Sequence, residues 1–168
     1  YGTADFWPGR PVAQGAVALM GRIHQEFEYR GKSTDVDTPV ADAFALRRGV
    51  CQDFAHVMIG VCRMLGLPAR YVSGYLLTRA TGGGPALVGA DASHAWVQVY
   101  CPATPGVDDG WLELDPTNDL VPDTQHVRLA LGRDYGDVCP IKGVLVGGGK
   151  HRMRVAVDVA PIPDEPAS

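Results

Sequence analysis

The positions of apolar residues predict a helix that begins at Cys51. Small or apolar side chains recur from Cys51 at the spacing of one helix face. Gly66 and Pro68 then supply a strong stop signal directly after Leu65. The sequence therefore predicts a helix over residues 51–65, with a buried stripe formed by Cys51, Ala55, Met58, Cys62 and Leu65.

Two further helices are predicted upstream. Pro11 suits a first helical position, and an apolar face continues after it for about 18 residues. Thr38-Pro39 predicts the start of a short helix that runs to about Leu46. Residues 1–10 contain a Phe-Trp-Pro-Gly stretch and are interpreted as an extended arm that ends in a turn.

After Pro68 the apolar residues follow a two-residue alternation, which is typical of strands. A Gly-Gly-Gly-Pro stretch inside residues 78–93 predicts a long loop. The segments with strand character are 70–77, 94–100, 110–115 and 126–131, and residues 144–146 with 150–160 are predicted to form a terminal hairpin before a frayed tail at 161–168.

The strands at 94–100 and 110–115 are predicted to pair in the antiparallel sense. If their connection is centred between Thr104 and Pro105, His94 lies directly opposite Asp115. Opposed residues have Cβ atoms about 5 Å apart, within the range of an imidazole–carboxylate hydrogen bond. Strand alternation also places Trp96 on the same face as His94.

The composition is that of one globular domain. The chain has 168 residues, of which 46% are hydrophobic and 20% charged, so we expect a real core and no extensive disorder. A net charge of -4 argues against nucleic acid as a partner. No apolar run approaches the roughly 18 residues of a membrane span. Four cysteines without a Cys-x-x-Cys pair predict a reducing, cytoplasmic location.

Cys51 is the candidate nucleophile. It lies in the first turn of its predicted helix, where unpaired N–H groups and the helix dipole favour negative charge on sulfur. At about 100° per residue, Asp53 and His56 point away from Cys51, so a base has to come from elsewhere in the chain. His94 supplies an imidazole, and Asp115 supplies the carboxylate that fixes its orientation.

Other polar residues receive weaker or structural interpretations. The Cys51 N–H is the first expected oxyanion donor, and the second is left open among Gln52, Trp96 and Tyr135. Asp53 and His56 are interpreted as structural. The remaining histidines and cysteines are interpreted as incidental, namely His24, His126, His151, Cys62, Cys101 and Cys139.

Three sequence blocks resemble the signature blocks of the transglutaminase-like superfamily, and more narrowly its bacterial transglutaminase-like cysteine protease branch. The blocks are Gly49–His56, Ser93–Val97 and Trp111–Thr117, supported by Gly66–Tyr75 and Gly132–Tyr135.

The resemblance implies an α+β, papain-like fold in which the Cys helix packs on an antiparallel sheet or barrel. Matched block to block, Cys51 takes the nucleophile's place, His94 the base's and Asp115 the orienting acid's. Members of this branch often carry a β-rich domain upstream. The chain begins at Tyr1 rather than methionine, so we expect an upstream portion to have been removed. An acidic cluster typical of a calcium site is not recognisable in the sequence.

The resulting hypothesis is a single catalytic domain that cleaves amide bonds through a thioacyl intermediate. Water as acceptor gives hydrolysis of peptides or peptide-like amides, which the resemblance favours, and an amine gives transamidation. We expect a peptide or protein substrate and no cofactor. A peptide-binding module without catalysis is the alternative. A metal site is a third possibility, which the absence of ligand spacing disfavours.

Overall fold

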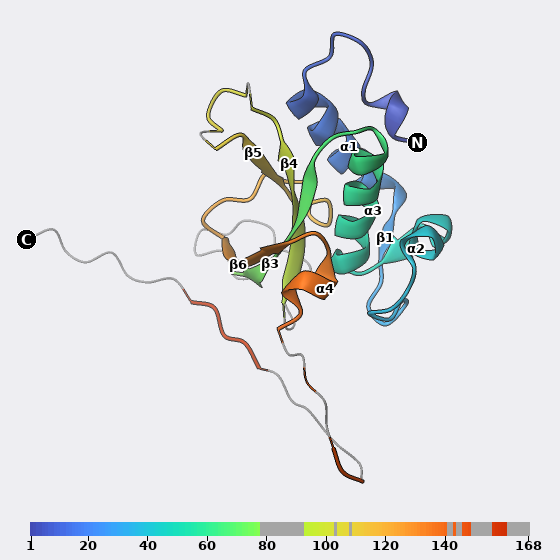
Figure 1. The fold of residues 1–168 in the computed structure, drawn as a ribbon, viewed down its shortest axis with the longest axis vertical. Helices are drawn as coiled ribbons and strands as arrows, with labels where there is room; N and C mark the ends of the chain where they lie inside the picture. The colour runs from blue at the N-terminus through green and yellow to red at the C-terminus, as the bar shows by residue number, and fades with distance from the viewer. Residues whose placement is uncertain are drawn as a thin grey trace, which may run out of the picture.

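Helix α3 (Cys51–Met64) occupies the middle of the molecule, packed between the sheet and the other helices (Figure 1). The computed structural model describes residues 1–77, 93–102, 104–107, 109–140, 143, 146–148 and 156–160. The Val50 N–H donates to the Asp53 carboxylate at 2.8 Å and caps the start of α3. Gly66, with φ of 76°, ends the helix. The predicted boundaries are therefore confirmed to within one residue.

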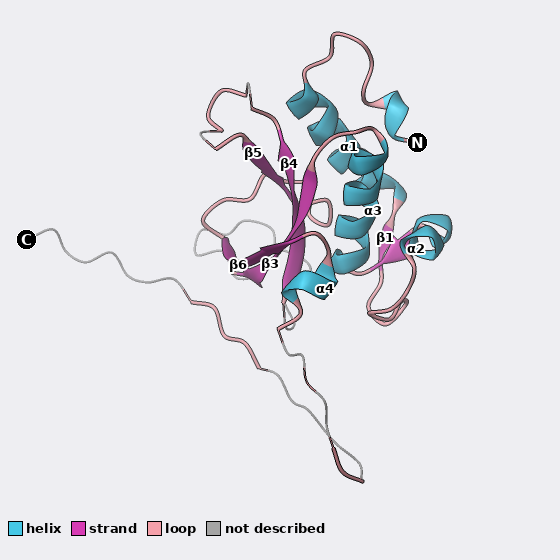
Figure 2. Cartoon of the chain, in the orientation of Figure 1, coloured by secondary structure: helices cyan, strands magenta, loops and turns pink. Residues whose placement is uncertain are grey.

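The central sheet has four antiparallel strands in the order β5-β4-β3-β6. Its members are β3 (Ala69–Leu76), β4 (His94–Tyr100), β5 (Trp111–Leu114) and β6 (His126–Gly132). Helices α1 (Val12–Glu26), α2 (Val40–Leu46) and α3 lie on one side of the sheet (Figure 2). This arrangement confirms the predicted α+β class with the Cys helix packed on an antiparallel sheet.

Several smaller elements accompany the sheet and these three helices. Strands β1 (Glu28–Tyr29) and β2 (Arg48–Gly49) form a short parallel pair that leads into α3. Helix α4 (Tyr135–Val138) follows β6. No helix in the described ranges combines the length and apolar character needed to cross a bilayer.

The core lies between the helices and one face of the sheet. Alternate β4 residues, namely Ala95, Val97 and Val99, belong to this core, and the equally buried His94, Trp96 and Gln98 lie on the opposite face of the strand. The fully buried helical side chains that meet the core residues of β4 include Leu19, Ile23, Phe54 and Met58. Burial of this stripe fixes the rotation of α3 and thereby the direction in which its first residue points.

The register between β4 and β5 differs from the prediction by two residues. Tyr100 pairs with Trp111 and Val97 with Leu114, so Asp115 lies just beyond the last paired position. The connecting turn is centred one residue later than expected, because the Cys101 N–H donates to the Gly110 carbonyl at 2.6 Å. A two-residue slip leaves every side chain on its original face.

Two predictions at the chain ends do not hold in the described residues. Residues 1–10 are not an extended arm, since Gly2–Ala4 form a short 3-10 helix and Asp5 pairs with Arg22 of α1. Residues 156–160 are not in a strand. The loop at 78–92 and the tail at 161–168 lie outside the described residues. The rest of the predicted terminal hairpin also lies outside them, with the exception of Val146.

Candidate active site

Cys51 is the first residue of α3 and is half-buried, with its thiol free. The backbone before it is fixed because the Arg30 N–H donates to the Gly49 carbonyl at 2.8 Å. Gly49 is required here, since a Cβ at this position would lie 2.5 Å from the Asp53 carboxylate. Asp53 also accepts a hydrogen bond from Thr34 at 2.6 Å, which confirms its structural role.

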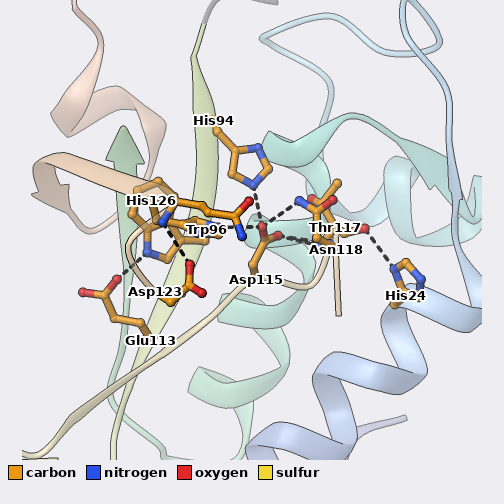
Figure 3. A network of polar contacts seen from close by, with 10 residues as sticks. His24, His94, Trp96, Glu113, Asp115, Thr117, Asn118, Asp123 and His126 are labelled. Carbon is orange, nitrogen blue, oxygen red and sulfur yellow. Dashed lines mark hydrogen bonds and ion pairs between the residues drawn. The ribbon is translucent and has the colours of Figure 1, made fainter. Parts of the chain in front are cut away.

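His94 and Asp115 form a fully buried pair. The Nε2 atom of His94 lies 2.8 Å from Oδ2 of Asp115, and neither side chain has any exposed surface (Figure 3). The other carboxylate oxygen, Oδ1, accepts the Thr117 N–H at 2.9 Å, and the Asn118 amide donates to Oδ2 at 2.8 Å. The contact predicted from the sequence therefore exists, although the predicted register is wrong.

Both members of the pair are charged at neutral pH. Burial would lower the pKa of His94, but the hydrogen bond to Asp115, the charge of that carboxylate and the proximity of Cys51 outweigh it and raise that pKa to about 9. Burial would raise the pKa of Asp115, but hydrogen bonds from His126, His94 and Asn118 hold it well below its usual range. The result is an imidazolium fixed against a carboxylate.

The second nitrogen of His94 is directed away from Asp115. Its Nδ1 atom is buried and has no hydrogen-bond partner within the described part of the chain. Cys51 is the other group that raises the pKa of His94. Nε2 is therefore committed to Asp115, and Nδ1 is left without a partner on the side of the ring away from the carboxylate.

Cys51 and His94 open onto a cavity of about 280 Å³. Asp115 is not among the lining residues and lies behind His94, shielded from the cavity. The walls are largely aromatic or small. They comprise Tyr29, Val36, Val50, Gln52, Tyr71, Ser73, Ser93, Ala95 and Tyr135. A larger apolar cavity of about 630 Å³ between the N-terminal residues, α2 and α3 has no Cys, His or carboxylate in its lining.

Of the three candidates for a second oxyanion donor, two line the cavity and one does not. Gln52 lines it but donates its amide to the Val36 carbonyl at 3.0 Å. Tyr135 also lines it, and its backbone N–H donates to His56 at 3.2 Å, which supports the structural interpretation of His56. Trp96 is fully buried and gives its indole N–H to Glu113 at 2.7 Å, so that candidate is wrong.

Two histidines that the sequence suggested were incidental belong to this network. His126 places Nε2 3.1 Å from the same Asp115 oxygen that His94 contacts. His24, on α1, contacts the Thr117 carbonyl through Nδ1 at 2.9 Å (Figure 3). Alternation along residues 126–131 predicts a strand but not the strand that it pairs with. The position of His126 in the sheet could therefore not be predicted from the sequence. His151 lies outside the described residues.

His94, Asp115 and His126 also form a group whose ligand atoms lie within 4.8 Å of one another, close enough to hold a metal ion. The sequence spacing gave no sign of it, because the three residues come from separate strands and a turn. A hydrogen-bonded network accounts for the same geometry, since an ionised carboxylate accepts from both Nε2–H groups.

A cysteine at a helix start therefore shares one cavity with the histidine of a buried His–Asp pair on an antiparallel sheet. The chain belongs to the transglutaminase-like superfamily, whose family model matches residues 7–116. It is 42% identical over 162 residues to an uncharacterized protein of Mycobacterium tuberculosis, an alignment that covers 96% of this chain and 51% of that protein.

Two further relatives carry functional names. The chain is 34% identical over 130 residues to a protein-glutamine gamma-glutamyltransferase of Pseudomonas aeruginosa, covering 74% of this chain and 19% of that protein. A crystal structure of a candidate cysteine protease from Cytophaga hutchinsonii superposes with a TM-score of 0.65 at 33% identity, covering 81% of this chain and 42% of the other. The chain spans about half the length of the mycobacterial relative.

Proposed function

We propose that this domain is a cysteine-dependent amide-bond enzyme that acts through a thioacyl intermediate. The supporting observation is the position of His94, which is hydrogen-bonded to buried Asp115 and shares one cavity with Cys51. A thiolate, an imidazolium and an orienting acid are the groups that acyl transfer through sulfur requires. The family relationship supports the same chemistry.

In the first step, the Cys51 thiolate attacks the carbonyl carbon of the substrate amide. The negative oxygen that forms is stabilised by the Cys51 N–H at the start of α3. His94 gives its proton to the departing nitrogen, the C–N bond breaks and a thioester remains on Cys51. An acceptor then loses a proton to His94 as it attacks the thioester, and the C–S bond breaks.

The acceptor decides between two activities. Water yields hydrolysis, and a primary amine yields transamidation; the named relatives include one of each kind. We propose hydrolysis of peptides or peptide-like amides as the main activity, with transamidation as the second candidate. The cavity favours a substrate whose acyl group is uncharged, because its described lining has no charged side chain other than His94 and the Cys51 thiolate.

The experiment is mass spectrometry of a peptide pool after incubation with the protein, with and without an added primary amine. New peptide termini indicate hydrolysis, and a mass increase equal to amine addition minus ammonia indicates transamidation. Cys51→Ala is the matched control and should produce neither. If the wild-type protein also leaves every peptide unchanged while still retaining some of them, the domain is a binding module instead.

A metal-dependent activity is tested in the same preparation. Stoichiometric zinc bound to the purified protein, with loss of activity on chelation, would contradict the thiol mechanism and assign His94, Asp115 and His126 as ligands. A cytoplasmic location remains a prediction. The four cysteines form no disulfide with one another in the structure.

A further inference from the structure

His126 reaches Asp115 from the far edge of the sheet. The strand order β5-β4-β3-β6 separates β6 from β5, the strand that ends just before Asp115, by two intervening strands. Even so, Nε2 of His126 lies 3.1 Å from Oδ2 of Asp115, and only 2% of the His126 side chain is exposed. The imidazole packs edge-on against the Trp96 ring, with ring centroids 5.2 Å apart.

A β-bulge in β6 puts His126 on the correct side of the sheet. Along β3, Ser73 pairs with Ala130 whereas the next residue, Gly74, pairs with Arg128, so Leu129 is the extra residue. With the bulge, His126 pairs with Leu76. Without it, Val127 would take that position and His126 would point to the opposite face, because a one-residue slip inverts every side chain.

Gly74 is the residue that permits this close approach. A Cβ at position 74 would lie 2.1 Å from the Val127 carbonyl oxygen and 2.5 Å from the Trp96 ring, both closer than real atoms come. Any side chain there would push β6 away from β3. The Ser-Gly pair in β3 and the bulge in β6 therefore together place the imidazole of His126 beside Asp115.

We propose that His126 is a positioning residue for the triad, which donates its Nε2–H to Asp115 and holds the carboxylate in register with His94. Because an ionised carboxylate only accepts hydrogen bonds, the nitrogen of His126 at 3.1 Å must be the donor. This inference rests on the proposed function, since it assigns His126 a role in keeping the imidazole of His94 directed at Cys51.

The other side-chain contacts of Asp115 come from its own turn. Its Oδ1 is held by backbone N–H groups of Thr117 and Asn118, from the same turn as Asp115 itself. Donors within one turn move with that turn and do not fix it relative to the sheet. In the described part of the chain, His94 and His126 are the side chains from sheet strands that reach Asp115, so His126 ties the turn to the sheet independently of the catalytic base.

The test compares two substitutions of His126. Gln retains an amide N–H at a similar reach, whereas Phe keeps the ring but removes the donor. We expect His126→Phe to lower the rate of Cys51 alkylation by iodoacetamide at pH 6 by about 10- to 100-fold, the loss that corresponds to one hydrogen bond to a charged group. His126→Gln should recover most of that rate. Val127→Thr, on the same strand, points away from Asp115 and is not among the cavity-lining residues, so it should match the wild type.

The outcomes separate this inference from the proposed function. If His126→Phe alkylates as fast as the wild type, or if Gln is as slow as Phe while both melt as cooperatively as the wild type, the inference is wrong. A second readout needs no reactivity, namely the downfield NMR signal of the proton between His94 and Asp115. That signal should persist in His126→Gln and shift or broaden in His126→Phe. If wild-type Cys51 itself is unreactive, the proposed function fails, and the NMR signal still decides the role of His126.

Discussion

Replacing Asp115 with Asn tests the electrostatics of the site most directly. The pKa of His94 is about 9 against an ordinary value of 6.5. That difference corresponds to about 3 kcal/mol of net stabilisation of the imidazolium by its surroundings. Asp115 comes first among the groups that raise this pKa, ahead of Cys51, so most of the stabilisation should disappear with its charge.

The substitution also changes which nitrogen of His94 carries the proton. An Asn amide can turn its N–H₂ toward Nε2, which makes Nε2 an acceptor and leaves the proton on Nδ1, the nitrogen available to Cys51. A neutral imidazole with that proton cannot accept one from the thiol. We therefore expect kcat/KM for peptide cleavage to fall by roughly 10³- to 10⁴-fold, the size of the loss seen when the orienting acid of a hydrolytic triad is amidated.

The assay is the pH dependence of Cys51 alkylation, measured beside turnover. In the wild type, alkylation should stay fast down to pH 6, because the imidazolium stabilises the thiolate. In Asp115→Asn, it should become fast only at alkaline pH, where an unassisted thiol ionises. Glu113→Gln is the matched control, a carboxylate-to-amide change two residues away that contacts Trp96 and Arg128. Unchanged alkylation and turnover in Asp115→Asn would refute the assigned role.

Three other predictions follow from the described contacts. Cys51→Ala should abolish turnover. It should shift the melting temperature by only a few degrees, because Cys51 is half-buried and alanine suits a helix start. Loss of cooperative melting in this variant would show that Cys51 is a packing residue. The contribution of His94 to the free energy of unfolding should be complete below pH 6.5 and should fall by up to about 3 kcal/mol as the pH rises through 9, since a raised pKa stabilises only the protonated folded state; His94→Asn should lack this slope in urea titrations. Gly74→Ala should destabilise the fold by more than about 2 kcal/mol, because the new Cβ would collide with the Val127 carbonyl oxygen. Gly60→Ala in α3, where a Cβ meets only Val40 at 4.0 Å, should instead stabilise the fold by about 0.5–1 kcal/mol. Equal effects of the two substitutions in thermal melts would contradict the bulge geometry.

The sequence allowed the main elements and the His94–Asp115 contact to be predicted because both depend on local periodicity. Helix α3 was recognisable from its apolar stripe and from the Gly-Leu-Pro that ends it. The side-chain contact between His94 and Asp115 was predicted correctly despite a two-residue error in register, because such an error preserves the face on which each side chain lies.

His126 could not be predicted for the opposite reason. Its position depends on a one-residue bulge, and a one-residue change inverts the face of every side chain beyond it. The sequence marks the bulge only through Gly74, a glycine inside the neighbouring predicted strand at 70–77. Pairing of β3 with β6 had to be known before that glycine could be interpreted.

The site is assembled from segments far apart in the chain, which makes the reactivity of Cys51 a measure of folding. Cys62 and Cys101 are buried, and burial raises the pKa of Cys62 to about 12 and raises that of Cys101. In the folded protein, both should resist alkylation at pH 6. As urea unfolds the chain, Cys51 should slow to the rate of an ordinary thiol because His94 and Asp115 leave it. At pH 8, Cys62 and Cys101 should become reactive over the same urea range. Different midpoints for these changes would show that the site comes apart before the core does.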